Sequence, residues 1–305
     1  MAPPPLHCPR CGRPAEGFEG CRSCASEGIG VNTPPPLADL TSHHLAVYPG
    51  GPWGWPGTLP TTGPPVTLGE GNTPNIRLRR ELPGTQPSVG AGELWLNRGS
   101  SAERNAAMAQ SVAERGWYPL TSYSSPSPGG NPYANEGYKS VAYELARDFA
   151  GRAIGAVVVP TSRADLLAGI GRGFRELAAA GLVAQMPRLV AAEPARSAPF
   201  TAALRCADRA DQELTRVTDR PSVAFSLGEE RPCWQGLDAL WRSHGTAVAV
   251  TDDAIMAECR RLAAEGLIME PSSAVAVAVA RGPAVAPGEL VVAVGTATGL
   301  KGLVS

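Results

Sequence analysis

Residues 154–180 read IGAVVVPTSRADLLAGIGRGFRELAAA and join a short apolar segment to a longer periodic one. The run Ala156–Val159 is continuously apolar, which is typical of a strand buried on both faces. Ala164–Ala180 follows at once with the residue spacing of a helix. A strand that passes directly into a helix is the unit from which parallel sheets covered by helices are built. This stretch therefore predicts an α/β fold.

The same alternation extends over most of the chain after Thr67. Asp252 and Asp253 supply a favourable N-cap for one of the helices. The pattern predicts a mainly parallel sheet with flanking helices. The expected strands are Glu93–Leu96, Ala156–Val159, Arg188–Ala192, Ser222–Phe225, Thr246–Val250 and Leu290–Val294. The expected helices are Ser101–Arg115, Tyr138–Phe149, Ala164–Ala180, Asp252–Glu265 and Ser272–Ala280.

The composition excludes several classes of partner. The 305 residues include 27 basic and 28 acidic ones, which give a formal net charge of −1. A nearly neutral chain without a long run of one sign does not favour nucleic acid or an anionic membrane as its main partner. No apolar stretch is long enough to cross a bilayer, and the N-terminus lacks the apolar core of a signal peptide. We therefore expect a cytoplasmic protein.

The N-terminal segment carries two CxxC pairs, Cys8 with Cys11 and Cys21 with Cys24. Each pair can present two thiolates from a tight turn, and together they can form a tetrahedral structural zinc site. The alternative is four reduced, unrelated thiols. The segments expected from these patterns are a zinc ribbon over residues 1–30, a docked Pro/Gly-rich connector over 31–66, and an α/β domain over 67–305.

Short motifs that lie in order along the chain resemble those of threonine synthase and its relatives, the fold-type II pyridoxal-phosphate (PLP) enzymes. They are LGEGNTP at 68–74, NPY at 131–133, EGYKS at 136–140, EPSSA at 270–274 and TATGLK at 296–301. The resemblance implies a parallel-rich sheet like that of the tryptophan synthase β subunit. It covers nearly the whole chain.

The chain also departs from that pattern. The resemblance implies a long segment that holds the Schiff-base lysine and most of the small domain, and this segment is missing. Lys139 and Lys301 are the only two lysines of the chain. Both match motif positions that lie outside the Schiff-base role.

The turn that would hold the cofactor phosphate is changed as well. In the family this turn is rich in glycine, so that the amides of the helix N-terminus can approach the phosphate. Here Ser162, Ala164 and Asp165 stand where the glycines would be. A carboxylate at that helix N-terminus repels a phosphate dianion, and the added side chains crowd it. The sequence thus disfavours PLP and leaves structural zinc as the expected cofactor.

The far wall of the expected pocket is retained. Thr296 matches the residue that meets the pyridine nitrogen in relatives, and Glu270 matches the glutamate of EPxSA. With Ser162 and Thr298, these residues form the candidate cofactor-binding set. Two alternatives stay open: backbone groups satisfy the Thr296 hydroxyl, and Glu270 only starts a helix.

The first functional hypothesis is an enzyme that uses the pocket implied by the resemblance without a PLP Schiff base. It would carry out a lyase, cyclase or isomerase reaction on an amino-acid-like or carboxylate substrate, with secondary metabolism as the expected setting. Such reactions need a positioned acid and base. The candidate catalytic residues are Arg163 as anion binder, Asp165 as acid or base, and Glu136, Tyr138 and Lys139.

Alternative readings remain for the residues and for the function. Arg163 and Asp165 can form a plain surface pair. The whole protein can be a non-catalytic pseudoenzyme or a partner subunit, or a PLP-dependent lyase with an atypical anchor. Because loss of a domain exposes apolar surface, we also expect self-association, most simply as a homodimer.

Overall fold

The computed structural model describes residues 6–15, 21, 23–24, 41, 101–117, 119, 123, 129–286 and 288–300. The LGEGNTP motif and the expected strand Glu93–Leu96 lie outside the described residues. So do Lys301 and, apart from Thr41, the expected connector.

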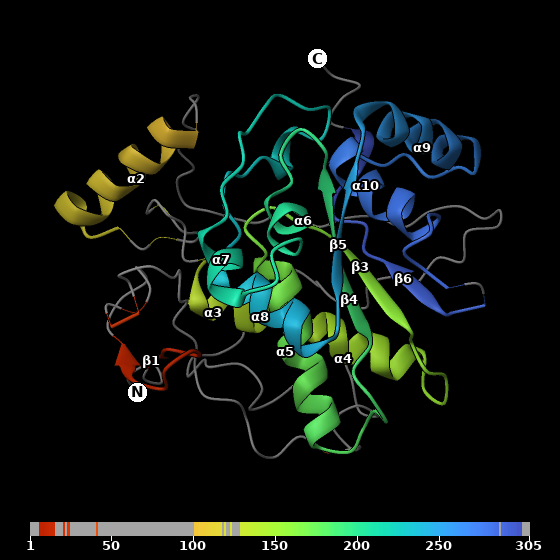
Figure 1. The fold of residues 1–305 in the computed structure, drawn as a ribbon, viewed down its shortest axis with the longest axis horizontal. Helices are drawn as coiled ribbons and strands as arrows, with labels where there is room; N and C mark the ends of the chain where they lie inside the picture. Colours follow the sequence, from red (N-terminus) through yellow and green to blue (C-terminus); the bar gives the residue numbers. More distant parts are fainter. Residues whose placement is uncertain are drawn as a thin grey trace.

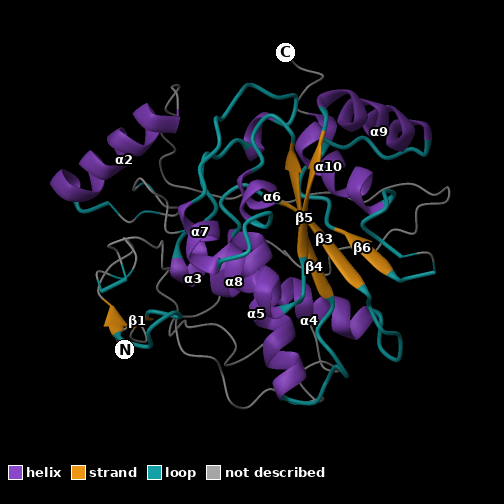
Figure 2. Cartoon of the chain, viewed as in Figure 1, coloured by secondary structure: helices purple, strands orange, loops and turns teal. Residues whose placement is uncertain are grey.

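A four-stranded parallel sheet forms the centre of the described structure (Figures 1 and 2). Its strands lie side by side in the order β5-β4-β3-β6. Val157 of β3 is paired with Leu189 of β4 on one side and with Val292 of β6 on the other. The strand bounds are Ala156–Pro160 for β3, Arg188–Pro194 for β4, Thr246–Val250 for β5 and Val291–Ala293 for β6. The expected α/β fold is confirmed.

Helices cover both faces of this sheet, because alternate residues of each strand point to opposite sides. Val157 and Val159 pack into one core cluster with the helices α4, α5 and α8. Ala156 and Val158 pack into a second cluster with α9 and α10. The helix bounds are Lys139–Asp148 for α4, Asp165–Ala179 for α5, Trp234–Arg242 for α8, Asp252–Ala264 for α9 and Pro271–Ala280 for α10.

The remaining described elements are shorter, except for one helix. The helix α2 spans Ser101–Arg115, as the sequence predicts. A small antiparallel pair joins β1 (Leu6–His7) to β2 (Pro14–Ala15). Short helices that the sequence does not predict are α3 at Pro132–Gly137, α6 at Pro199–Ala203, α7 at Arg209–Leu214 and the 3-10 turn η2 at Phe225–Leu227. Among the described helices none is both long and apolar enough to cross a membrane.

Two local predictions are wrong. Ser222–Phe225 is not a strand, because the Ser222 hydroxyl donates to Asp252 at 2.6 Å and accepts from the Ala224 amide at 3.2 Å, which makes a turn. The N-cap of α9 is Thr251, whose hydroxyl accepts from the Ala254 amide at 3.3 Å. Asp252 is the first residue inside that helix.

The strand order creates a switch point. From β3 the chain leads through α5 to β4 on one side, whereas β6 lies on the other side of β3. The connections therefore diverge where β3 and β6 meet, and ligands of open α/β sheets bind at the carboxyl ends of strands at such a point. We refer to the carboxyl ends of β3 and β6 as the switch-point edge.

Close packing between α4 and α5 depends on Gly173. A Cβ added there would lie 2.7 Å from the Ala142 Cβ and 2.8 Å from the Lys139 carbonyl oxygen. Backbone cannot move aside as a flexible side chain can. We therefore expect Gly173→Ala to lower the free energy of unfolding by about 1–3 kcal/mol, as overpacking does.

A matched control is Gly137→Ala, since a Cβ added at Gly137 meets nothing within 4 Å. Alanine favours helix over glycine by up to about 1 kcal/mol, so this variant should be unchanged or slightly more stable. Chemical denaturation of both variants measures the difference. Equal stability of the two would show that α4 and α5 are not in close contact at Gly173.

Candidate functional site

The loop between β3 and α5 forms one wall of the switch-point edge. Ala164 has a left-handed backbone, with φ of 62°, and α5 begins at the next residue. The loop is tied to the segment around 228–233. The Ser162 hydroxyl donates to the Gly228 carbonyl at 3.3 Å, and the Cys233 thiol donates to the Arg163 carbonyl at 2.9 Å. These bonds hold the entry to α5 in place.

Asp165 is the first residue of α5, and its carboxyl group is partly buried. Burial raises the pKa of Asp165, and the Arg163 charge opposes this shift only in part. Arg163 makes its ion pair with Glu229, at 3.4 Å. The plain surface pair of Arg163 with Asp165, which the sequence left open, is therefore not what the structure shows.

Tyr138 lies near Asp165. Burial and the Asp165 charge both raise the pKa of the Tyr138 phenol, although 38% of the residue is exposed. A Cβ added to Gly169 of α5 would lie 2.4 Å from the Tyr138 Cβ, so this tyrosine rests directly on α5. Tyr138 and Asp165, two of the predicted catalytic residues, thus lie near each other.

Glu136 and Lys139 belong to a buried ionic cluster enclosed by α3, α4 and α5. The Lys139 amine lies 2.8 Å from Glu136 and 3.0 Å from Glu176. Tyr143 donates to Glu176, and Arg172 pairs with Glu136. Lys139 is fully buried, and burial lowers its pKa while the Glu176 charge opposes that shift. Two cations here balance two carboxylates, so the amine is already committed within the fold.

The opposite wall of the switch-point edge follows β6. The hydroxyl groups of Ser273 and Thr296 lie 2.9 Å apart, and Ser273 also accepts from the amides of Thr296 at 3.1 Å and Ala297 at 2.7 Å. The partner of the Thr296 hydroxyl is thus a side chain rather than backbone. Thr298 donates to the Ile268 carbonyl at 3.3 Å. These contacts fix the loop after β6.

Glu270 occupies the N-cap position of α10. Its carbonyl oxygen accepts from the amides of Ser273 at 2.8 Å and Ala274 at 3.0 Å, while its carboxylate makes no capping bond. Glu270 therefore starts the helix, as one of the two open readings predicts. Ser273, which sequence reasoning missed, is the residue that connects α10 to Thr296. Its place in the EPSSA motif was the available signal.

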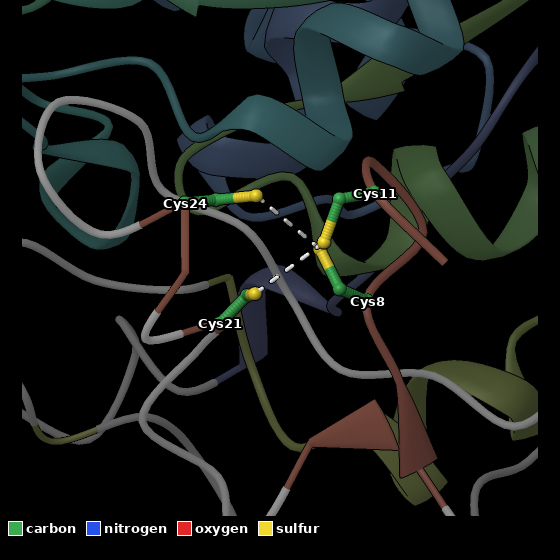
Figure 3. A group of neighbouring side chains, drawn as sticks. All are labelled: Cys8, Cys11, Cys21 and Cys24. Atoms are coloured by element: carbon green, nitrogen blue, oxygen red, sulfur yellow. Dashed lines mark hydrogen bonds between the residues drawn. The ribbon is translucent and has the colours of Figure 1, made fainter. Parts of the chain in front are cut away.

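The four cysteines of the N-terminal segment converge (Figure 3). Their sulfur atoms all lie within 4.8 Å of one another, with Cys8 to Cys24 at 3.8 Å and Cys11 to Cys21 at 3.7 Å. Arg10, between two of these cysteines, pairs with Glu213 of α7 at 2.7 Å. This grouping lies outside the switch-point edge.

The amino-acid sequence matches one protein family and several known enzymes. Residues 87–297, more than two thirds of the chain, match the family model described as pyridoxal-phosphate dependent enzyme. Threonine synthase of Methanocaldococcus jannaschii is 30% identical over 151 residues, which are 48% of this chain and 36% of that protein. Threonine synthase of Synechocystis sp. is 31% identical over 187 residues, which are 60% of this chain and 45% of that protein. The chain therefore spans less than half the length of these two relatives.

The solved structure of O-ureido-L-serine synthase has a similar fold. It superposes with a TM-score of 0.52 at 21% sequence identity, covering 68% of this chain and 57% of that chain. Likeness at this level of identity concerns the fold alone.

The cofactor expectation from the sequence is wrong. PLP was disfavoured there, whereas the matched family is defined by its dependence on PLP. The comparisons also give no support to zinc as the cofactor. The structure does bring the sulfur atoms of Cys8, Cys11, Cys21 and Cys24 together, but nothing tests whether they bind a metal, so their role as metal ligands stays a prediction.

A structural role for Lys139 can be tested by stability. Removal of one partner from a buried ion pair leaves an uncompensated charge and costs about 3–5 kcal/mol. We expect Lys139→Met to lower the free energy of unfolding by that amount in urea denaturation. Arg147→Met is the control, because Arg147 of the same helix pairs with the partly exposed Asp148 and such a pair contributes about 1 kcal/mol or less. Similar losses for both would remove the case for a buried cluster.

The raised pKa of Asp165 has a signed consequence for stability. The folded state holds this proton more tightly than the unfolded state, whose pKa is near the ordinary 3.8. The stabilisation is complete below that pH and is lost as the pH rises through the folded pKa. Asp165→Asn should therefore gain stability relative to wild type as the pH rises from about 4 to 7. Urea denaturation at several pH values measures the trend, with exposed Asp253→Asn as control. Parallel curves for wild type and Asp165→Asn would contradict the prediction.

Proposed function

The chain belongs to the pyridoxal-phosphate dependent enzymes, and on that premise we propose that it acts with PLP on an amino-acid-like or carboxylate substrate. The proposed reaction is of lyase, cyclase or isomerase type. PLP supplies an electron sink that stabilises negative charge on a substrate carbon. The observation that carries the proposal is that the switch-point edge, where α/β folds bind ligands, lies within the residues that match the family.

The described residues fit PLP in part. Thr296 stands at the edge with a hydroxyl fixed by Ser273, as a polar contact to a bound ring requires. The first turn of α5 fits less well, because the Asp165 carboxylate occupies the helix N-terminus to which an anion would bind. A phosphate bound at this turn would therefore lie against the Asp165 carboxyl group, whose pKa burial raises.

Lys139 does not fit the covalent anchor. It is the only lysine within residues 87–297, and its amine is buried between two carboxylates. A lysine attachment of PLP to this chain therefore requires Lys301, the only other lysine, which lies outside the described residues. We propose Lys301 for that role.

The pair of Asp165 and Tyr138 is proposed as the acid–base apparatus. Burial raises the pKa of Asp165, which brings a carboxyl group closer to the pH at which proton exchange is efficient. Arg163, held by Glu229 at 3.4 Å, provides a positive charge beside the same loop for a substrate carboxylate.

A second candidate is a non-catalytic binding protein built on the same fold. The commitment of the Lys139 amine favours it, because no lysine within the described residues is left for catalysis. In that case the edge would bind an amino-acid-like ligand without turnover. Homodimer formation, a cytoplasmic location and a place in secondary metabolism stay predictions under either candidate.

The two candidates separate in one experiment on the full chain. PLP is added, the complex is reduced with borohydride, and the modified peptide is identified by mass spectrometry. We expect one PLP per chain, attached at Lys301, and loss of the adduct in Lys301→Gln. An adduct on Lys139 would contradict the buried cluster. Tryptophan fluorescence unaffected by PLP, together with no adduct, would contradict PLP binding and leave the non-catalytic candidate.

Catalysis is tested by exchange of the α-proton in D₂O. With PLP bound, proton NMR should show exchange of the α-proton of L-serine or L-threonine. Asp165→Asn should slow this exchange about a hundredfold or more while PLP still binds, since positioned acid–base groups contribute on that order. Asp253→Asn serves as the control. Equal exchange by wild type and Asp165→Asn would exclude Asp165 from the reaction.

A further inference from the structure

A hollow lies at the carboxyl ends of β4 and β5, on the part of the sheet away from the switch-point edge. Its volume is about 390 Å³. Three segments line it: the turn after β4 with the helix α6, the loop around 217–220, and the end of β5. Hollows of about 300–1,000 Å³ are the size of small-molecule sites.

The lining of this hollow, which we call the arginine pocket, is strongly cationic. Arg196, Arg205 and Arg220 line it together with Thr218 and with Thr201, whose hydroxyl donates to Glu193. The other lining residues are alanines and one valine. Among the residues that the structure describes, no carboxylate belongs to the lining. Guanidinium groups and hydroxyls are the groups that bind phosphate in proteins.

The charge around the arginine pocket is not neutralised by its surroundings. Arg196 pairs with Asp252 at 3.0 Å, and Asp252 also accepts from Ser222. Within the part of the chain that the structure describes, Arg205 and Arg220 make no ion pair. Counted over the lining and the Asp252 carboxylate alone, the three guanidinium groups leave two positive charges, which suit the dianion of a phosphate monoester.

Two further carboxyl groups lie near the arginine pocket without lining it. Glu193 contacts the lining residue Thr201, and Asp219 is the neighbour of Arg220 in the sequence. Glu193 is fully buried, and its two oxygens accept from the Phe200 amide at 2.9 Å and from the amide and hydroxyl of Thr201, each at 2.7 Å. The carboxylate of Asp219 lies against Gly228, since a Cβ added there would be 2.8 Å from both its oxygens.

The scaffold of the arginine pocket is rigid where the arginines attach. The Arg220 amide donates to the Arg196 carbonyl at 3.2 Å, which joins two of the cationic segments. The Ala195 amide donates to the Val250 carbonyl at 2.7 Å, which ties the turn after β4 to the end of β5. The Glu193 carboxylate accepts from the first amides of α6 and so fixes the start of that helix. The backbone that carries Arg196 and Arg220 is thereby set before any ligand arrives.

We propose that the arginine pocket is a second ligand site, separate from the switch-point edge, that binds the phosphate group of a small phosphate monoester. Arg205 and Arg220 contact the phosphate oxygens, Arg196 adds charge while it keeps its pair with Asp252, and the alanine and valine methyl groups face a short carbon skeleton. The proposal does not depend on the function proposed for the switch-point edge.

The test is calorimetric titration of the full chain in a chloride buffer, with inorganic phosphate, glycerol phosphate and acetate as probes. We expect one phosphate site, at least equal affinity for glycerol phosphate, and much weaker binding of acetate. Arg205→Ala and Arg220→Ala should each weaken phosphate binding about ten- to a hundredfold, the range for a hydrogen bond to a charged group. The control is Arg260→Ala, which removes an exposed arginine of α9 that does not line the pocket.

Each other outcome overturns the proposal. No phosphate binding by wild type would exclude the site, and an equal loss in Arg260→Ala would reveal unspecific charge attraction. Phosphate binding that survives both pocket substitutions would place the anion elsewhere, and acetate as effective as phosphate would exclude the dianion. PLP is itself a phosphate monoester, so the two sites are distinguished by the borohydride-reduced adduct at Lys301 and not by PLP binding as such. Arg205→Ala should weaken phosphate binding and leave the yield of that adduct unchanged, and absence of the adduct in wild type would leave the phosphate result standing.

Discussion

The rest of the described structure depends on the amine of Lys139, which is buried between Glu136 and Glu176. Taking these charges out of water is costly, and mutual attraction repays the cost only while all partners stay in place. Because the partners come from α3, α4 and α5, the cluster orients these helices against one another. The orientation of α5 then sets where Asp165 lies at the end of β3. Lys139, which the sequence suggests as a catalytic residue, thus holds α3, α4 and α5 together.

The parallel sheet has two separate edges at the carboxyl ends of its strands. β3 has a neighbour on each side, so its carboxyl end faces the loop after β6 as well as its own helix. β4 and β5 end away from that point, and the segments that follow them bring three arginines to one hollow. The same sheet therefore carries Asp165 and Tyr138 near one edge and a group of arginines near another. Their chemistry differs because the loops differ, while the strands that support them are alike.

Sequence patterns predict the fold well where a signal is local. Apolar runs and helical periodicity locate the four central strands and the helices α2, α4, α5, α9 and α10 to within a few residues. They fail at Ser222–Phe225, where a hydrogen bond to Asp252 from a distant part of the chain replaces strand pairing. The residues of the candidate site are predicted less well, because their contacts also join parts of the chain that are far apart in the sequence. Motifs point to Lys139, but only packing against α5 shows that Arg172 and Glu176 enclose it, and the arginines of the second pocket belong to no motif.

The ion pair between Arg10 and Glu213 joins residues separated by 203 positions. A ribosome makes about 5–20 residues each second, so roughly 10–40 s pass between the synthesis of one partner and the other. During that interval the cysteine cluster next to Arg10 has no α7 on which to dock. This ion pair can therefore form only after α7 has been synthesised, although Arg10 is among the first residues of the chain to be made.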